Sequence, residues 1–377
     1  MAIFSQRSSA CSTLLLSLAL TPLSPAQDST AAATSSDELM NGMITTVDPC
    51  AGNPNEAVCR CALEFPPVTY DTSVSLTLLD RDTSPDLLAT GRTLMNLIRA
   101  TVVSIAPSPD ADPPVRLYIN PPSTPNPGPA FEKLVHTNPA FKDLELVQTL
   151  LLPRNLGGQA DRLFGSIWWH EPTSSLVVAF RGTQTPFEFH LDTLVGSQRV
   201  IKNQKTGATM KVSEGFGTGY LMMRDEILEA ITPYASRANT VLVAGHSLGG
   251  AIAAVATIDI ALGEQFNSVF GMTFGQPRVF DPETASVANG VKALNISPIL
   301  RVICESDPVP DVPPAAVTGN GAKYQHTRNS VIYFDDPSAA SGKGAQWNHH
   351  FYYDGYFDDE KTAQFGVTKT RKAPDKS

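Results

Sequence analysis

The feature that most constrains this chain is a short glycine-rich bend between an apolar run and an alanine-rich run. Residues 240–244 (Thr-Val-Leu-Val-Ala) are apolar, and Gly-His-Ser-Leu-Gly-Gly follows at 245–250. An alanine-rich segment then continues to Leu262. The sequence therefore predicts a buried strand, a tight bend with Ser247 at its apex, and a helix over 248–262.

A serine at the apex of such a bend is typical of an enzymatic nucleophile. Glycines at 245 and 249 remove the Cβ atoms that would clash where the helix packs back on the strand, and the serine takes strained backbone angles. Its hydroxyl is then exposed at the carboxyl edge of the sheet, where the helix N-terminus offers N–H groups to a developing oxyanion. The alternative is a glycine-rich turn with an incidental serine.

The serine needs an oriented histidine base, because a free hydroxyl is a weak nucleophile. If acid and base follow the serine along the chain, the candidates for the base are His326, His349 and His350. His326 precedes a strand-like run and fits a surface turn equally well. His349 and His350 follow a Gly/Ala/Ser-rich loop at 338–345, which suits a base presented over the sheet edge.

The acid is expected just past a strand between the serine and the histidine. Asp307 fits because it follows the apolar run at 301–304, and Pro308 ends that strand. Its role would be to accept a hydrogen bond from the histidine ring and to stabilise the imidazolium without taking the proton. Asp311 and Asp281 are alternatives, since an Asp before Pro is often only a turn former.

Strand-like and helix-like segments alternate through the second part of the chain. Besides the segments around Ser247, the sequence predicts strands at 163–169, 176–180, 268–274 and 300–304, a hairpin turn at 170–173, and helices at 85–105 and 215–231. This alternation favours the α/β class, with a mostly parallel central sheet flanked by helices.

The N-terminal residues carry the pattern of an exported protein. Residues 1–26 combine Arg7, a short leucine-rich run and small residues before a cleavage point, which predicts a secretory signal and an extracellular protein. No transmembrane anchor is expected, because the run is far shorter than the about 20 residues that a bilayer needs. Residues 27–140 form a predicted N-terminal extension, 141–360 the catalytic domain and 361–377 a polar tail.

Four cysteines remain after the predicted signal and permit three disulfide connectivities. Cys50, Cys59 and Cys61 lie within twelve residues, which suggests one local bridge, while Cys304 is distant. A metal site would need a further Cys or His beside the cluster, and the sequence has none there. Asn295 begins the one glycosylation sequon, Asn-Ile-Ser.

Composition excludes two classes of protein. Apolar residues make up 42% of the 377 residues, which is enough for a large core and too much for a disordered acidic chain. The net charge of −9 argues against nucleic acid as a partner, because phosphate binding needs a concentrated basic face.

Together these segments resemble the secreted class 3 lipases, which share the α/β-hydrolase fold with feruloyl esterases. The resemblance covers about 164–353 in the family's order. It rests on Val-Val-Ala-Phe-Arg-Gly-Thr at 177–183, the bend at 245–250, Thr-Phe-Gly-Gln-Pro-Arg-Val at 273–279, Ser-Asp-Pro-Val-Pro at 306–310, and a late His-x-x-aromatic segment.

The resemblance implies Ser247 as nucleophile, Asp307 as acid, and an oxyanion hole from the backbone N–H groups of Thr183 and Leu248, with the Thr183 hydroxyl fixing the loop. In the family the base is followed by Tyr three residues later and then by an aromatic residue. His349 gives Tyr352 and Tyr353, whereas His350 gives Tyr353 and Asp354, so the resemblance favours His349 as base and leaves His350 as the alternative.

The resemblance also places a lid after the oxyanion loop. Phe187, Phe189 and Leu191 alternate with polar residues, which predicts an amphipathic flap at an oil–water surface, and a half-buried strand or loop is the alternative. Two departures from the family bear on this region: Ser-Glu-Gly-Phe stands at 213–216 in place of His-x-Gly-Phe, and no tryptophan follows Thr183.

The implied activity is hydrolysis of acylglycerol esters through an acyl-enzyme, without a metal or organic cofactor. A feruloyl or other carboxyl esterase and a phospholipase A1 are the alternatives among enzymes, since specificity is set by pocket and lid. A catalytically silent, lipase-like binding protein is the alternative from another class. Acyl-chain length and oligomeric state do not follow from the sequence.

Overall fold

A computed structural model describes the central part of the chain and a few flanking segments. The described residues are 64–65, 84–103, 115–116, 141, 143–153, 162–290, 299–304, 307–317, 321–327, 331–334, 349, 352 and 370–371. The predicted signal, the cysteine cluster (Cys50, Cys59 and Cys61), Asn295 and His350 lie outside them, so the predictions made for these residues stay predictions.

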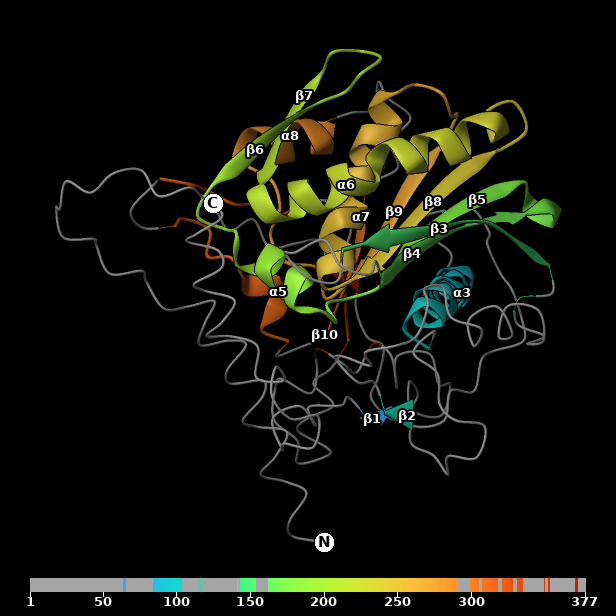
Figure 1. The fold of residues 1–377 in the computed structure, drawn as a ribbon, viewed down its shortest axis with the longest axis horizontal. Helices are drawn as coiled ribbons and strands as arrows, with labels where there is room; N and C mark the ends of the chain where they lie inside the picture. Colours follow the sequence, from blue (N-terminus) through green and yellow to red (C-terminus); the bar gives the residue numbers. More distant parts are fainter. Residues whose placement is uncertain are drawn as a thin grey trace, which may run out of the picture.

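A mostly parallel sheet forms the centre of the molecule (Figure 1). Its strand order among the described residues is β12-β11-β10-β9-β8-β5-β4-β3. The pairs from β5 through β8, β9 and β10 to β11 are parallel, and the β3–β4, β4–β5 and β11–β12 pairs are antiparallel. The strands are β3 (Leu144–Leu152), β4 (Arg162–His170), β5 (Ser175–Phe180), β8 (Thr240–His246), β9 (Val269–Phe274), β10 (Leu300–Cys304), β11 (Val331–Phe334) and β12 (Thr370–Arg371). The predicted α/β class is confirmed.

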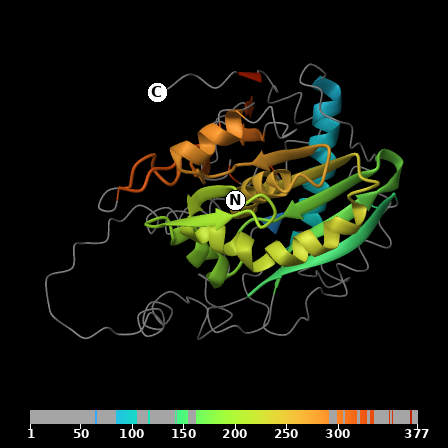
Figure 2. The same cartoon turned by 90° about the horizontal axis from the view of Figure 1, so that it is seen from above.

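Helices cover both faces of the sheet, which explains why the central strands are apolar along their whole length. Helices α6 (Glu214–Ile231) and α7 (Leu248–Leu262) lie on one face and α3 (Ser84–Val103) on the other (Figures 1 and 2). All residues of α7 are buried, and its alanines let it sit close to β8 and β9. Because α7 starts directly after Ser247, this packing fixes the position of the bend.

The remaining elements lie around this core. They are β1 (Glu64–Phe65), β2 (Val115–Arg116), α5 (Pro186–Thr193), β6 (Gln198–Lys202), β7 (Thr209–Ser213), α8 (Pro282–Gly290) and the short 3-10 turns η2 (Glu171–Thr173), η3 (Thr232–Tyr234) and η5 (Val309–Asp311). The predicted turn at 170–173 is η2, closed by Ser174 in the left-handed region at φ 49°. Strand β3, the β6–β7 hairpin, α5 and α8 were not predicted.

Helix α3 belongs to the predicted N-terminal extension, yet it packs against β4, β5 and β8. Leu94, Leu97 and Ile98 on this helix are fully buried. The extension therefore packs on the central sheet through a buried apolar face. In the described part of the chain, no helix has the length and apolar character needed to cross a membrane.

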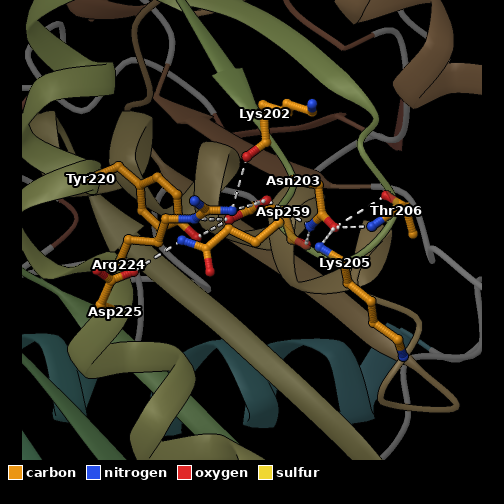
Figure 3. Close-up of polar contacts among 9 residues, drawn as sticks. Lys202, Asn203, Lys205, Thr206, Tyr220, Arg224, Asp225 and Asp259 are labelled. Carbon is orange, nitrogen blue, oxygen red and sulfur yellow. Dashed lines mark hydrogen bonds and ion pairs between the residues drawn. The ribbon is translucent and has the colours of Figure 1, made fainter.

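A buried polar cluster ties the β6–β7 hairpin to the helical layer (Figure 3). Asp259 of α7 accepts hydrogen bonds from the Tyr220 hydroxyl (2.7 Å), the Arg224 Nε (2.7 Å) and the Asn203 amide (2.8 Å). The side chains of Arg224 and Asp259 are 6% and 0% exposed. Because every oxygen of this carboxylate has a donor, the cluster is a structural ion pair that fixes the hairpin.

Asp259→Ala is expected to lower the free energy of unfolding by about 3–5 kcal/mol, because it leaves the Arg224 charge buried without its partner. Urea unfolding measures the change. Glu229→Ala is the matched control, since Glu229 is exposed on α6 and its removal should cost no more than about 0.5 kcal/mol. Equal unfolding midpoints for the two variants would show that the buried pair stabilises nothing.

Candidate active site

Ser247 lies on the predicted bend between β8 and α7. Its backbone angles are φ 56° and ψ −124°, a conformation that non-glycine residues rarely adopt, and its N–H donates to the Phe274 carbonyl (3.0 Å). The residue is partly exposed, although its neighbours on both sides are buried. The strained turn thus directs the hydroxyl out of the core at the carboxyl edge of the sheet.

The glycines of the bend are required by close backbone approach. A Cβ on Gly245 would lie 2.1 Å from the Gly249 carbonyl oxygen, and a Cβ on Gly249 would lie 2.2 Å from the Arg181 carbonyl oxygen. The second distance shows that the start of α7 lies against the end of β5, so the loop after β5 begins beside the serine.

His349 and Asp307 complete a hydrogen-bonded chain with Ser247. The His349 Nε2 lies 2.8 Å from the Ser247 Oγ, and its Nδ1 lies 3.1 Å from both oxygens of Asp307. A carboxylate only accepts hydrogen bonds, so Nδ1 carries the proton and Nε2 is left to accept the serine O–H. The three side chains come from the ends of β8 and β10 and from a late segment of the chain.

The carboxylate of Asp307 is buried and held by two further donors. The Tyr352 hydroxyl donates to it (2.7 Å), and so does the backbone N–H of Val309 (2.9 Å). The same hydroxyl accepts from the N–H of Cys304 (2.8 Å) at the end of β10. Burial and the Asp307 charge raise the pKa of Tyr352 well above its ordinary value, so its hydroxyl stays a donor at neutral pH.

Gly275 explains how closely these groups pack. It has φ 56°, and a Cβ there would lie 2.9 Å from the Asp307 Oδ2 and 2.9 Å from the Tyr352 ring. The residue belongs to the segment at 273–279 that carried part of the resemblance. The hydrogen bond from the Tyr352 hydroxyl to Asp307 was not predicted. The sequence spacing shows only that the tyrosine follows the base by three residues.

Three of the other candidates, His326, Asp311 and Asp281, have partners away from Ser247, and His350 lies outside the described residues. The Nε2 of His326 hydrogen-bonds the Pro310 carbonyl (2.8 Å), and burial holds the pKa of His326 well below its ordinary value. Asp311 pairs with Arg278 (3.0 Å), and Asp281 accepts from the Thr284 N–H at the start of α8 (2.9 Å).

The predicted oxyanion residues flank the serine. The first described main-chain bond of α7 runs from the Ala251 N–H to the Ser247 carbonyl, so the N–H of Leu248 belongs to the helix end that lacks an intrahelical partner. Thr183 follows Gly182, and a Cβ on that glycine would lie 3.3 Å from the Ser247 Cβ. The Thr183 hydroxyl donates to Asp192 (2.6 Å), and this bond joins the loop to α5.

Asp192 is an unpredicted titratable group at this loop. Its residue is partly exposed, but its carboxyl group is withdrawn from water, and this raises its pKa to about 7. The Thr183 hydrogen bond and the nearby His349 lower the pKa, whereas the charge of Glu188 raises it further. Between its ordinary pKa of 3.8 and about 7, the folded protein therefore binds more protons than the unfolded chain.

We expect this carboxyl to reduce stability as the pH rises from about 4 to about 7, since stability falls wherever the folded state binds more protons. In Asp192→Asn the amide oxygen still accepts the Thr183 hydroxyl, but the group no longer titrates. Urea unfolding midpoints measured between pH 5 and pH 8 should therefore fall more steeply for the wild type than for the variant. Parallel curves would contradict the raised pKa.

The segment predicted to form a lid is a helix, so the alternative of a half-buried strand or loop was wrong. In α5, Phe187 and Leu191 lie four residues apart and are 6% and 1% exposed within the main core, while Phe189 is partly exposed. The alternation of apolar residues is incidental, because the spacing of four residues decides which side chains are buried.

A buried ion pair anchors α5 to the end of β5. The Nη1 and Nη2 nitrogens of the Arg181 guanidinium both donate to Glu188 (2.8 Å each), and these side chains are 1% and 0% exposed. Thr185 and Glu188 also form a capping box, each side chain bonding the backbone of the other. The sequence signal for this helix was the Thr-x-x-Glu pattern at 185–188.

The region around Ser247 is similar in sequence to known lipases. The family model for lipase (class 3) matches residues 177–317. A lipase of Rhizomucor miehei is 38% identical over 129 residues, which are 32% of this chain and 34% of the relative. A secreted mono- and diacylglycerol lipase of Malassezia globosa is 36% identical over 123 residues, 32% of this chain and 38% of the relative. The chain thus spans about a third of the length of these curated relatives.

A solved structure of Rhizomucor miehei triacylglyceride lipase is 26% identical, covers 53% of this chain and 70% of that chain, and has a TM-score of 0.39. The mostly parallel sheet of this chain, with a serine on the bend from β8 to α7, is an α/β-hydrolase arrangement. Residues 177–317, which include Ser247 and Asp307, match the class 3 lipase family, and the similarity of this chain to that family extends over this region.

Proposed function

We propose that this chain is a secreted serine ester hydrolase that cleaves acylglycerols through Ser247, His349 and Asp307. The observation that carries the proposal is the hydrogen-bonded chain from the Ser247 Oγ through both ring nitrogens of His349 to Asp307. The nucleophile, base and acid of a serine hydrolase need this order of contacts. The family match of residues 177–317 and the named activities of the relatives support ester hydrolysis.

In the proposed reaction the Ser247 Oγ attacks the ester carbonyl carbon while its proton passes to the His349 Nε2. The carbonyl oxygen becomes an oxyanion that accepts from the N–H groups of Thr183 and Leu248. As the intermediate collapses, the ester C–O bond breaks, and His349 gives the proton to the leaving alcohol. Water then attacks the acyl-serine by the same route and releases the fatty acid.

Asp307 serves this cycle by stabilising the imidazolium form of His349, and its other contacts keep the carboxylate in place. Tyr352 and the Val309 N–H both donate to it, so the carboxylate cannot rotate away from the ring. Each step moves protons and one acyl group only, and the proposed cycle uses no metal or organic cofactor.

The substrate class follows from the relatives by analogy. Two relatives, at 38% and 36% identity, are named as a lipase and as a secreted mono- and diacylglycerol lipase, and another is named as a chloroplastic phospholipase A(1) of Arabidopsis thaliana. We therefore place acylglycerols first and phospholipids second. The secreted relative and the predicted signal at residues 1–26 support an extracellular location.

A carboxyl esterase is the second candidate, and the anchored helix α5 is the observation that favours it. A lid that opens at an oil surface must leave its resting place, but α5 is held by the buried Arg181–Glu188 pair and by Phe187 and Leu191 in the core. Ser247 is partly exposed with α5 in this position. We therefore propose that α5 is a fixed wall of the site and that turnover does not require an interface.

Hydrolysis of p-nitrophenyl esters tests both proposals. Preference for long acyl chains is expected for a lipase, whereas preference for short or aryl acyl groups would favour the esterase. With α5 fixed, the rate should follow one saturation curve as the substrate passes its solubility limit. A sharp increase in rate at that limit would contradict the fixed wall, and no hydrolysis of any ester would overturn the enzymatic assignment.

A further inference from the structure

His246, the residue before the nucleophile, contacts the base directly. It ends β8, it is 2% exposed, and its Nε2 lies 2.8 Å from the main-chain carbonyl oxygen of His349. A carbonyl oxygen only accepts hydrogen bonds, so Nε2 carries the proton and donates. The bond joins the strand that bears Ser247 to the backbone of a residue about a hundred positions later.

The ring of His246 also contacts other parts of the site. Its centroid lies 4.7 Å from the His349 ring, with an interplanar angle of 31°, and 5.4 Å from the Tyr352 ring. On its other side, a Cβ on Gly182 would lie 3.0 Å from the His246 Nδ1. The imidazole thus lies between the loop that precedes Thr183 and the side chains of the base and of Tyr352.

We propose that His246 is a positioning residue that holds the base by bonding its backbone and packing against its ring. The hydrogen bonds of the His349 ring orient it toward Ser247 and Asp307. They do not fix the position of the His349 backbone, which needs other contacts. His246 supplies such a contact from the rigid end of β8. Since Ser247 is the next residue, one strand end fixes both partners of the proton transfer.

The proposal rests on the proposed function, because it assigns His246 a task in the transfer between Ser247 and His349. Placement matters strongly there: a shift of about 1 Å in a reacting group costs about 10²-fold in rate. His246 touches no reacting atom in this proposal, so its removal should lower kcat and leave KM unchanged.

A pair of amide substitutions separates the hydrogen bond from the bulk of the ring. In His246→Gln the amide nitrogen reaches about as far as Nε2 and still donates to the carbonyl, whereas in His246→Asn the amide is too short. We expect kcat on a dispersed p-nitrophenyl ester to fall about 10²-fold in the Asn variant and to be largely restored in the Gln variant. Wild-type kcat in both variants, or equal loss in both, would overturn the proposal.

A second readout does not depend on turnover. In protein labelled with 15N-histidine, the Nδ1 proton of His349 bonded to Asp307 gives a downfield proton resonance. We expect this resonance in the wild type and the Gln variant and its loss in the Asn variant. A wild type that shows the resonance but hydrolyses no ester would refute the proposed function alone, whereas retention of the resonance in the Asn variant would refute the role of His246.

Discussion

Replacing Ser247 with alanine should reduce the rate of ester hydrolysis by about 10⁴-fold or more. The residual rate is the one that substrate binding and oxyanion stabilisation provide without a nucleophile. The Ser247 hydroxyl lies 2.8 Å from the Nε2 of His349, and its removal leaves the base without a proton to accept. Initial rates on p-nitrophenyl esters, together with far-ultraviolet circular dichroism to verify folding, measure the effect.

The matched control is Ser236→Ala, since Ser236 is an exposed serine after η3 and outside the site. It should hydrolyse the same esters at the wild-type rate. If the Ser247→Ala protein retained substantial activity while folded, a different nucleophile would have to be sought, and the proposed acyl-enzyme would be excluded.

The second large effect is expected at the base. His349→Ala should lose about 10⁴-fold or more in kcat, because residues that act together in a triad are each indispensable to it. The ring of His349 lies between Ser247 and Asp307, with 3.1 Å to the acid, and no contact of another described histidine replaces that arrangement. The same ester assay at saturating substrate gives the value.

His350→Ala tests the alternative that the sequence left open. We expect this variant to keep most of the wild-type activity, and added imidazole to restore part of the activity of His349→Ala by entering the space of the missing ring. The reverse pattern, with His350→Ala inactive and His349→Ala active, would make His350 the base.

The bend at Ser247 was predictable because its causes are local. The apolar run, the glycines and the alanine-rich run are continuous in sequence, and the strained φ of 56° follows from them. Asp307 was selected by its position after a strand, and parallel strands deliver their carboxyl ends to one edge of a sheet. His349 was selected over His350 by the resemblance, through the spacing to Tyr352.

The helical structure of α5 was not predicted, because two sequence patterns in this segment indicate different structures. Alternation of Phe187, Phe189 and Leu191 suggested a period of two, whereas the capping box at Thr185 and the ion pair from Arg181 to Glu188 make the segment helical. A local capping signal was therefore present, but it was outweighed by the pattern of apolar residues.

Two polar interactions of the site could not be read from the sequence. The donation from Tyr352 to Asp307 spans 45 positions, and that from the His246 ring to the His349 carbonyl spans 103. Such contacts require the packing of β8, β10 and the late histidine segment at the same time. Single-sequence patterns describe one element at a time, so they assign the residues but not these bonds.

Labelling with an alkyl fluorophosphonate, followed by mass spectrometry of the digested protein, tests most directly whether Ser247 is a nucleophile activated by His349. The reagent should add once, on the peptide that contains Ser247, with a rate that falls sharply in His349→Ala and with no adduct in Ser247→Ala. Stoichiometric labelling of another residue, or equal labelling of Ser247 with and without the imidazole, would contradict the triad.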